Sequence, residues 1–341
     1  MTRAVVYDAP RRFDLREVPT PAAAVGEVVV DVELAGVCGT DLHLHDGGFF
    51  ASFPLTPGHE SVGSVREVGE GVEHVHVGQR VVVDNASACG RCAACSRGDA
   101  LFCERFRSLG VNAPGGFAGS LVSPGHKVYA ADDLPLDVAV FAEPLACAVH
   151  GMDVLGLRPG ADVLVVGSGT TGLLLTQLLV HGGAGRVTVA APTEFKLGLA
   201  RSYGADRVVH VTRDAAETAR ALAGLQPQGF DVTVDVTGAS SVVETLPSLT
   251  ASNGTVFVYG MCDEDDRVAL SPYDVFRRQL TVKGSFAQVN CMERSLAMLR
   301  SGRVRTEGLI THRFPLAGYG DALDTLAHDP TSLKVVVEPQ R

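Results

Sequence analysis

Apolar strand-like runs alternate with helical patterns between about residue 155 and residue 285. Short runs rich in valine predict six strands, at residues 163–166, 186–190, 207–211, 231–236, 255–259 and 280–283. Stretches with apolar residues at helical spacing separate most of them, at residues 173–180, 196–203 and 242–249. This alternation predicts an α/β fold, a Rossmann doubly wound six-stranded parallel sheet with helices on both faces.

The first 130 residues show a different pattern. β-type runs at residues 26–34, 64–68 and 79–83 are punctuated by glycines, and we expect no strong amphipathic helix there. Short strands joined by glycine-rich turns predict a β-rich unit of the barrel or sandwich type. Beyond residue 285 the pattern predicts one helix at 292–301 and a final strand at 333–338, in a tail that we expect to return to the first domain.

Length and composition indicate a globular protein of two domains. The chain has 341 residues, of which 46% are hydrophobic and 20% charged. Its net charge of −10 comes with scattered basic residues, which argues against nucleic acid or a membrane surface as a partner. No uninterrupted apolar run is long enough to span a bilayer, and Asp8, Arg11 and Arg12 interrupt any signal-peptide core. We therefore expect a cytoplasmic protein whose eight cysteines are metal ligands and buried thiols.

Four of these cysteines are closely spaced. They are Cys89, Cys92, Cys95 and Cys103. Four thiolates from one short lobe can converge tetrahedrally on an ion and leave no open coordination position, so such a site has a structural role. The spacing fits a structural zinc ion, while an iron–sulfur cluster or free surface thiols stay open as alternatives.

A second group of ligand-type residues lies between residues 38 and 60. Cys38 offers a thiolate, His59 an imidazole and Glu60 a carboxylate, which together suit a zinc ion. We expect separate loops to bring them together. Thr40 and His43 supply a hydroxyl and a second imidazole, which are suited to passing a proton outward.

A glycine-rich loop follows the first strand of the predicted parallel sheet. It consists of Gly167, Ser168, Gly169, Thr170, Thr171 and Gly172. Between a strand and a helix, G-x-G-x-x-G predicts a dinucleotide site, with the pyrophosphate at the helix N-terminus. The loops that contain Thr237 and Gly260 follow later strands at the same edge, and we expect them near the nicotinamide.

The second strand of this sheet ends without the acidic residue that usually binds the ribose hydroxyls of NAD. Ala191 occupies that place. An acid would repel a 2′-phosphate, so its absence permits NADP, and Thr193 and Lys196 are candidates to bind that phosphate. We expect NADP to be favoured over NAD, although no arginine follows Ala191 directly.

The ordered set of motifs resembles the zinc-dependent medium-chain dehydrogenases/reductases over essentially the whole chain. The motifs are Cys38-Gly39-Thr40-Asp41, Gly58-His59-Glu60, the four-cysteine lobe and the glycine-rich loop. Ala142-Glu143-Pro144-Leu145 is similar to the branch that acts on sorbitol, xylitol and arabinitol. The resemblance implies a discontinuous β-rich GroES-like catalytic domain at residues 1–152 and 286–341, with a structural-zinc lobe at 86–106. It implies a Rossmann dinucleotide-binding domain at residues 153–285.

The resemblance also implies two zinc ions per chain, one structural in the four-cysteine lobe and one catalytic. The residues implied around the catalytic ion are Cys38, His59, Glu60 and Glu143. A thiolate and one carboxylate already neutralise Zn²⁺, so we expect one glutamate to bind tightly and the other to be exchangeable or to hold a water molecule. Their order stays open.

The same resemblance assigns the proton relay to Thr40 and His43, and it makes Asp41 a candidate to orient His59. The implied reaction is zinc-dependent, NAD(P)-linked oxidation of a secondary alcohol of a polyol to the ketone, and the reverse, by hydride transfer. Two alternatives stay open, a dehydrogenase of L-threonine or a cyclitol, and a non-catalytic nucleotide-binding protein on the same fold. The family implies a homodimer or homotetramer that assembles through residues 280–285.

Overall fold

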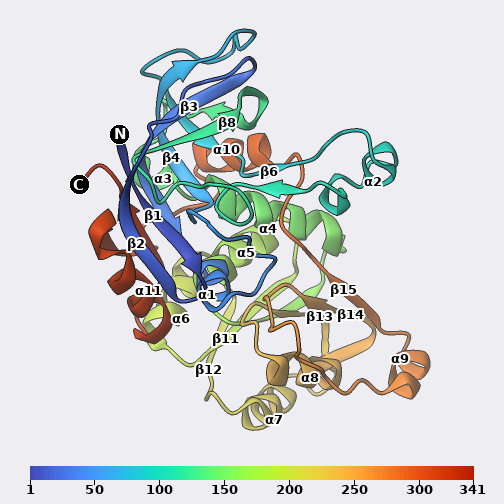
Figure 1. Ribbon diagram of the computed structural model, residues 1–341. Coiled ribbons are helices and arrows are strands. Elements are labelled where there is room, and N and C mark those ends of the chain that lie inside the picture. The colour runs from blue at the N-terminus through green and yellow to red at the C-terminus, as the bar shows by residue number, and fades with distance from the viewer. The chain divides into compact units, whose positions relative to one another are not determined.

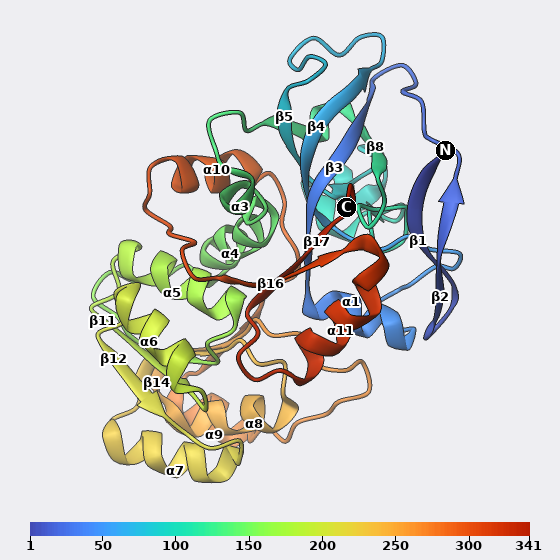
Figure 2. The same ribbon diagram turned by 90° about the vertical axis from the view of Figure 1, so that its left-hand side faces the viewer.

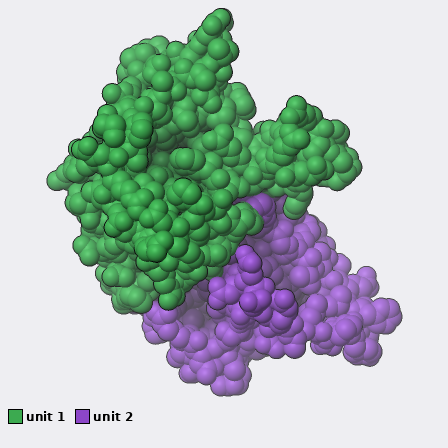
Figure 3. Space-filling view, in the orientation of Figure 1, with its two compact units in different colours: residues 1–146, 288–302, 306–341 green, residues 147–287, 303–305 purple.

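The computed structural model describes residues 1–341 and divides into two compact units (Figure 3). Unit 1 contains residues 1–146, 288–302 and 306–341, and unit 2 contains residues 147–287 and 303–305. The borders expected from the sequence follow residues 152 and 285. Helix α4 (Ala142–Leu155) is continuous across the first border between the units, so no linker marks that border in the sequence.

Unit 1 is built on a seven-stranded sheet, in the order β16-β17-β3-β4-β5-β9 with β8 paired to β3. Figure 2 shows β3, β4, β5 and β8 side by side. The strands are β3 (Glu27–Val37), β4 (Glu60–Val68), β5 (Arg80–Val83), β8 (Ser120–Pro124), β9 (Val128–Ala130), β16 (Ile310–Pro315) and β17 (Lys334–Glu338). Two hairpins complete the β structure: β1 (Thr2–Ala9) with β2 (Arg12–Val18), and β6 (Ala86–Ser87) with β7 (Arg107–Ser108).

The core of unit 1 lies against one face of this sheet. Val28, Val30 and Val32 alternate along β3 and are fully buried in one hydrophobic cluster. These alternate positions point to one face of the sheet, while Val29 and Leu34 on the other face are buried as well, so β3 is a central strand covered on both faces. Tyr319 and Leu323 of helix α11 pack into the same cluster, so the C-terminal part of the chain completes it.

The helices of unit 1 are short. They are α1 (Gly39–Asp46), α2 (Ala93–Ser96), α3 (Leu136–Ala139), the first turn of α4, α10 (Met292–Arg300), α11 (Tyr319–His328) and the single turns η1 (Ala100–Phe102), η2 (Gly125–Lys127) and η3 (Leu316–Gly318). The helix expected at residues 292–301 and the final strand expected at 333–338 are confirmed as α10 and β17, but α11 and β16 were not predicted. β16 carries polar and half-exposed residues, and Gly320 interrupts the α11 pattern, so neither has a strong periodicity.

Unit 2 has the predicted parallel sheet, in the order β12-β11-β10-β13-β14-β15 (Figure 1). Its strands are β10 (Asp162–Val166), β11 (Arg186–Ala191), β12 (Arg207–His210), β13 (Phe230–Asp235), β14 (Thr250–Val258) and β15 (Thr281–Gly284). The helices are α5 (Thr170–His181), α6 (Glu194–Ser202), α7 (Ala215–Leu225), α8 (Ser240–Leu249) and α9 (Pro272–Arg278). All six predicted strands are confirmed, whereas α7 and α9 were not predicted.

One stretch, Leu136–Leu155, is long and apolar enough to cross a membrane, judged by length and composition alone. Of its most apolar part, 67% is buried inside the protein. Asp137 and Glu143 interrupt it, which is why no uninterrupted apolar run was found in the sequence. This burial is typical of a core helix.

Candidate active site

Three adjacent strands of unit 1 bring the candidate catalytic residues together. Cys38 directly follows β3 and precedes α1, and Glu60 is the first residue of β4. The two strands are antiparallel, with Gly36 opposite Glu60. Lys334 begins β17, which pairs with β3 on its other side. A helix start and two strand ends therefore position these side chains, where the sequence had suggested loops.

The ligand atoms of Cys38, His59 and Glu60 all lie within 4.8 Å of one another. His59 is 6% exposed and Glu60 is 1% exposed. A thiolate, an imidazole and a carboxylate that converge in a buried place form a donor set that fits zinc. The Cys38 thiol lies 3.8 Å from the hydroxyl of Thr40, which places that hydroxyl beside the ligand set.

Asp41 is fully buried and links the helix start to His59. One carboxylate oxygen of Asp41 accepts the backbone N–H of Cys38 at 2.9 Å. The other lies 3.8 Å from Nδ1 of His59, and both of these atoms are buried without a hydrogen-bond partner. Burial raises the pKa of Asp41 to about 6. Burial lowers the pKa of His59, but the charges of Asp41, Cys38 and Glu143 raise it well above its ordinary value, so the pocket favours a cation.

Lys334 is a member of this site that sequence reasoning missed. Its ammonium donates to both carboxylate oxygens of Glu60, at 2.7 and 2.5 Å, and the lysine is 3% exposed. Burial lowers the pKa of Lys334, but the charges of Glu60 and Cys38 raise it above the ordinary value, so the ammonium stays charged. The available signal was a lysine inside the apolar strand at residues 333–337, because a buried charge requires a partner.

Gly36 makes room for the carboxylate of Glu60. A Cβ atom at Gly36 would collide with Oε2 of Glu60. Since β3 and β4 are hydrogen-bonded neighbours at this point, the backbone cannot move aside cheaply, and only glycine lets the Glu60 side chain lie across the strand.

Glu143 lies close enough for its charge to raise the pKa values of both His59 and Lys334. It is 7% exposed and stands in the first turn of α4. The hydroxyl of Ser295 in α10 donates to the Ala142 carbonyl at 2.6 Å and anchors that turn. His43 lies in the last turn of α1 and is half-buried.

The four cysteines of the lobe at residues 86–106 also converge. Their sulfur atoms lie within 4.8 Å of one another, with 3.5 Å between Cys92 and Cys95 and 3.9 Å between Cys92 and Cys103. Four thiolates at about 2.3 Å from a tetrahedral zinc ion would lie roughly 3.8 Å apart. None of the cysteines forms a disulfide. The backbone N–H groups of Cys89 and Arg105 donate to the Cys103 sulfur, as expected around a thiolate ligand.

Each of the three glycines in the glycine-rich loop of unit 2 has a different structural role. Gly167 has a φ of 112°, and a Cβ there would lie 2.9 Å from Val236. A Cβ at Gly172 would lie 2.5 Å from the Gly167 carbonyl oxygen, so this glycine allows α5 to pack onto β10. A Cβ at Gly169 would meet nothing within 4 Å. The backbone at Gly169 is thus open to a ligand, as a pyrophosphate requires.

The side chains of this loop fit an anion as well. Ser168 and Thr170 have hydroxyl oxygens that are buried without a hydrogen-bond partner. Buried hydroxyls normally find partners, so these two suit the phosphate oxygens of a bound dinucleotide. Thr171 is half-buried in the first turn of α5.

The remaining predicted coenzyme residues lie at the carboxyl edge of the same sheet. Ala191 ends β11 and is buried, Thr193 precedes α6, and Lys196 lies in the first turn of α6. The Thr237 hydroxyl donates to the buried Asp235 at 2.5 Å, which fixes the loop after β13. A Cβ at Gly260 would lie 2.6 Å from the Asp235 carboxylate, so close packing explains that glycine.

Two further polar side chains are engaged within the protein. Lys283 donates to the carbonyls of Val154 and Leu155 at 3.0 and 2.8 Å and caps the end of α4. His45 is half-buried and its Nδ1 lies 2.8 Å from the Tyr7 hydroxyl.

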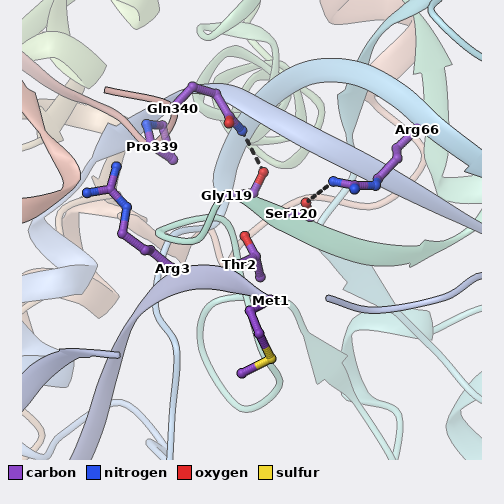
Figure 4. A pocket seen from close by; sticks show the side chains of 8 residues that line it. All are labelled: Met1, Thr2, Arg3, Arg66, Gly119, Ser120, Pro339 and Gln340. Atoms are coloured by element: carbon purple, nitrogen blue, oxygen red, sulfur yellow. Dashed lines mark hydrogen bonds between the residues drawn. The ribbon is translucent and has the colours of Figure 1, made fainter. Parts of the chain in front are cut away.

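A cavity of about 250 Å³ in unit 1 contains none of the candidate site residues (Figure 4). Its two arginines already have partners. Arg66 donates to Asp31 at 3.0 Å, and Arg3 donates to the Arg341 carbonyl at 3.1 Å.

A Rossmann sheet with an open glycine loop, together with a separate zinc-type ligand set, defines the class of metal-dependent dehydrogenases linked to a nicotinamide coenzyme. The profile of the alcohol dehydrogenase GroES-like domain matches residues 24–133, and the zinc-binding dehydrogenase profile matches residues 170–301. The chain therefore belongs to the zinc-binding dehydrogenase family, whose members use zinc and NAD(P), and it is an alcohol dehydrogenase in the broad sense.

Individual relatives cover nearly the whole chain. D-arabinitol dehydrogenase 1 of Uromyces fabae is 41% identical over 98% of this chain and 97% of its own length. D-altritol 5-dehydrogenase of Agrobacterium fabrum is 34% identical, with 97% and 98% covered. L-threonine 3-dehydrogenase of Saccharopolyspora erythraea is 33% identical, with 95% of each chain covered. A zinc-binding dehydrogenase of Sinorhizobium meliloti 1021, solved with NADP bound, is 32% identical with a TM-score of 0.92 over 99% of both chains.

Proposed function

We propose that this enzyme oxidises a secondary hydroxyl group of a polyol to the ketone with NADP, and catalyses the reverse reaction. The observation that carries the chemistry is the buried convergence of Cys38, His59 and Glu60 beside the Thr40 hydroxyl. The full-length similarity to a D-arabinitol dehydrogenase, at 41% identity, supports the substrate class.

Zinc, when bound, would supply the Lewis acidity that lowers the pKa of a coordinated hydroxyl towards neutrality. The chain supplies the proton path. Thr40 accepts the hydroxyl proton of the alcohol and gives up its own hydroxyl proton. His43, at the end of α1, carries that proton towards solvent. The carboxylate of Asp41, 3.8 Å from Nδ1 of His59, keeps the imidazole ring in its orientation. A nicotinamide coenzyme held by the glycine-rich loop at residues 167–172 would accept the carbon-bound hydrogen as hydride.

Lys334 balances the charge of the candidate metal ligands. Cys38, Glu60 and Glu143 together carry three negative charges, one more than a zinc ion compensates. The ammonium of Lys334 supplies the remaining positive charge from a buried position against Glu60. We infer that Glu60 is the exchangeable carboxylate, shared between Lys334 and the metal, and that Glu143 binds the metal or its water molecule.

The four-cysteine lobe holds a second zinc ion in this proposal, and its sulfur spacing of 3.5 and 3.9 Å supports that ion. NADP is the proposed coenzyme because Ala191 replaces the acid that would repel a 2′-phosphate, and because a similar structure was solved with NADP. Initial rates with NADP and NAD test this preference, and a higher kcat/KM with NAD would contradict it.

The proposed oligomer is a homodimer or homotetramer that forms through the edge strand β15. This strand is largely exposed, and Tyr273 and Phe276 of the neighbouring helix α9 are 69% and 79% exposed. An open strand edge beside exposed aromatic residues favours pairing with a second copy. Light scattering at several protein concentrations tests the assembly.

A substrate panel tests the proposed activity. We expect the highest kcat/KM with a pentitol or hexitol such as D-arabinitol, D-altritol, xylitol or sorbitol. L-threonine and a cyclitol are included because one relative at 33% identity is an L-threonine 3-dehydrogenase. A turnover with L-threonine that exceeds turnover with every polyol would contradict the substrate class while leaving the hydride-transfer chemistry intact.

A further inference from the structure

The end of strand β11, at residues 191–193, carries no cation of its own. Ala191 is buried, Pro192 follows it, and Thr193 offers only a hydroxyl. Glu194, in the first turn of α6, brings a negative charge to the same loop. Lys196 lies in the same turn but already has an interaction within the protein, so a preference for NADP, as proposed above, calls for a further donor at this edge.

The neighbouring strand supplies one. β12 pairs with β11 in parallel, and His210 is the register partner of Ala191. The backbone N–H of Val211 also donates to the Ala191 carbonyl at 3.1 Å, so the pairing continues to the end of both strands. Partner residues on neighbouring strands lie about 4.8 Å apart with their side chains on the same face. The imidazole of His210 therefore stands beside the place where an acidic side chain at position 191 would project.

His210 and Arg213 are available for binding. Both are exposed, and neither side chain makes a hydrogen bond or ion pair within the protein. Arg213 lies in the loop after β12, at the same carboxyl edge. The acids closest in sequence are engaged at the start of α7, because Asp214 accepts the N–H of Glu217 at 2.8 Å and Glu217 accepts the hydroxyl of Thr212 at 2.9 Å.

We propose that His210, assisted by Arg213, is the specificity-determining residue that binds the 2′-phosphate of NADP, from the strand next to the one that ends in Ala191. The inference rests on the proposed coenzyme preference. An N–H donor from His210 and the guanidinium of Arg213 form charge-assisted hydrogen bonds to phosphate oxygens. The 2′-hydroxyl of NAD offers no charge for them, so the contact discriminates between the two coenzymes.

Binding of small coenzyme fragments tests this directly, without turnover. Calorimetric titration compares adenosine 2′,5′-bisphosphate with adenosine 5′-monophosphate on the zinc-loaded enzyme. We expect His210→Ala to weaken binding of the bisphosphate by about 10- to 100-fold and to change the affinity for the monophosphate by no more than about twofold. His210→Arg keeps an N–H donor at this position and should retain the preference, and Arg213→Met should lower the preference by a smaller factor.

A matched control is His126→Ala, which removes an exposed histidine of unit 1 and should change neither affinity. Steady-state kinetics should show the same pattern, with KM for NADP raised in His210→Ala and kcat retained. If the unmodified enzyme prefers the bisphosphate and His210→Ala binds it equally well, the role of His210 is overturned and the NADP preference stands. If the unmodified enzyme binds both fragments equally, the preference itself fails and the role of His210 fails with it.

Discussion

Replacing Lys334 by methionine would leave the carboxylate of Glu60 buried without its cation. Glu60 is 1% exposed and accepts two hydrogen bonds from Lys334, so solvent cannot replace the ammonium. Removing one partner of a buried ion pair typically costs about 3–5 kcal/mol. For a unit the size of unit 1, this corresponds to a fall in Tm of about 6–20 °C.

Thermal unfolding of Lys334→Met and unmodified enzyme, followed by circular dichroism after dialysis against a chelator, measures this cost. Added zinc should restore part of the loss in the variant, because the metal then compensates the charge of Glu60. Lys334→Arg keeps the positive charge, so its Tm should fall less. In the double variant Glu60→Gln/Lys334→Met no uncompensated charge remains, so its loss should be smaller than that of Lys334→Met alone. A Tm of chelated Lys334→Met within about 1 °C of the unmodified enzyme would refute this account of the site.

Three further predictions concern other parts of the chain. Cys103→Ser should remove one zinc ion per chain and open the lobe at residues 86–106 to proteolysis; an unchanged metal content would contradict the structural site. Lys283→Met should lower stability by about 1–3 kcal/mol through the lost hydrogen bonds to the end of α4, with kcat/KM for the alcohol within about twofold; a selective loss of activity would contradict this purely structural role of Lys283. Ala191→Asp should lower kcat/KM for NADP by more than about tenfold and spare NAD, since a like charge then faces the 2′-phosphate; an equal effect on both coenzymes would argue against that placement.

The sheet of unit 2 was predictable because each of its strands has a recognisable pattern in its own local sequence. Each is a short valine-rich run, and parallel strands buried on both faces need such runs. The glycine loop was recognisable for the same local reason, because Gly167, Gly169 and Gly172 each serve a backbone requirement within one turn. Cys38, His59 and Glu60 could be proposed as ligands from residue type and order alone.

Lys334 was not predictable in this way because its contact with Glu60 spans 274 positions of sequence. The pairing of β17 with β3 creates that contact, and no local pattern encodes which strand lies beside which. His210 was missed for a related reason, since its position opposite Ala191 depends on the register of β11 and β12. Helix α11 and strand β16 were missed because their polar and glycine residues weaken the local periodicity.

The most direct test of the zinc mechanism is the metal content and activity of Cys38→Ser beside the unmodified enzyme. Emission spectroscopy on the purified proteins should give two zinc ions per chain for the unmodified enzyme and one for the variant. NADPH formation with the best alcohol of the substrate panel should fall by more than about a hundredfold in the variant, with the circular dichroism spectrum unchanged. A Cys38→Ser enzyme that keeps its turnover would contradict the assignment of Cys38, His59 and Glu60 as the catalytic metal site.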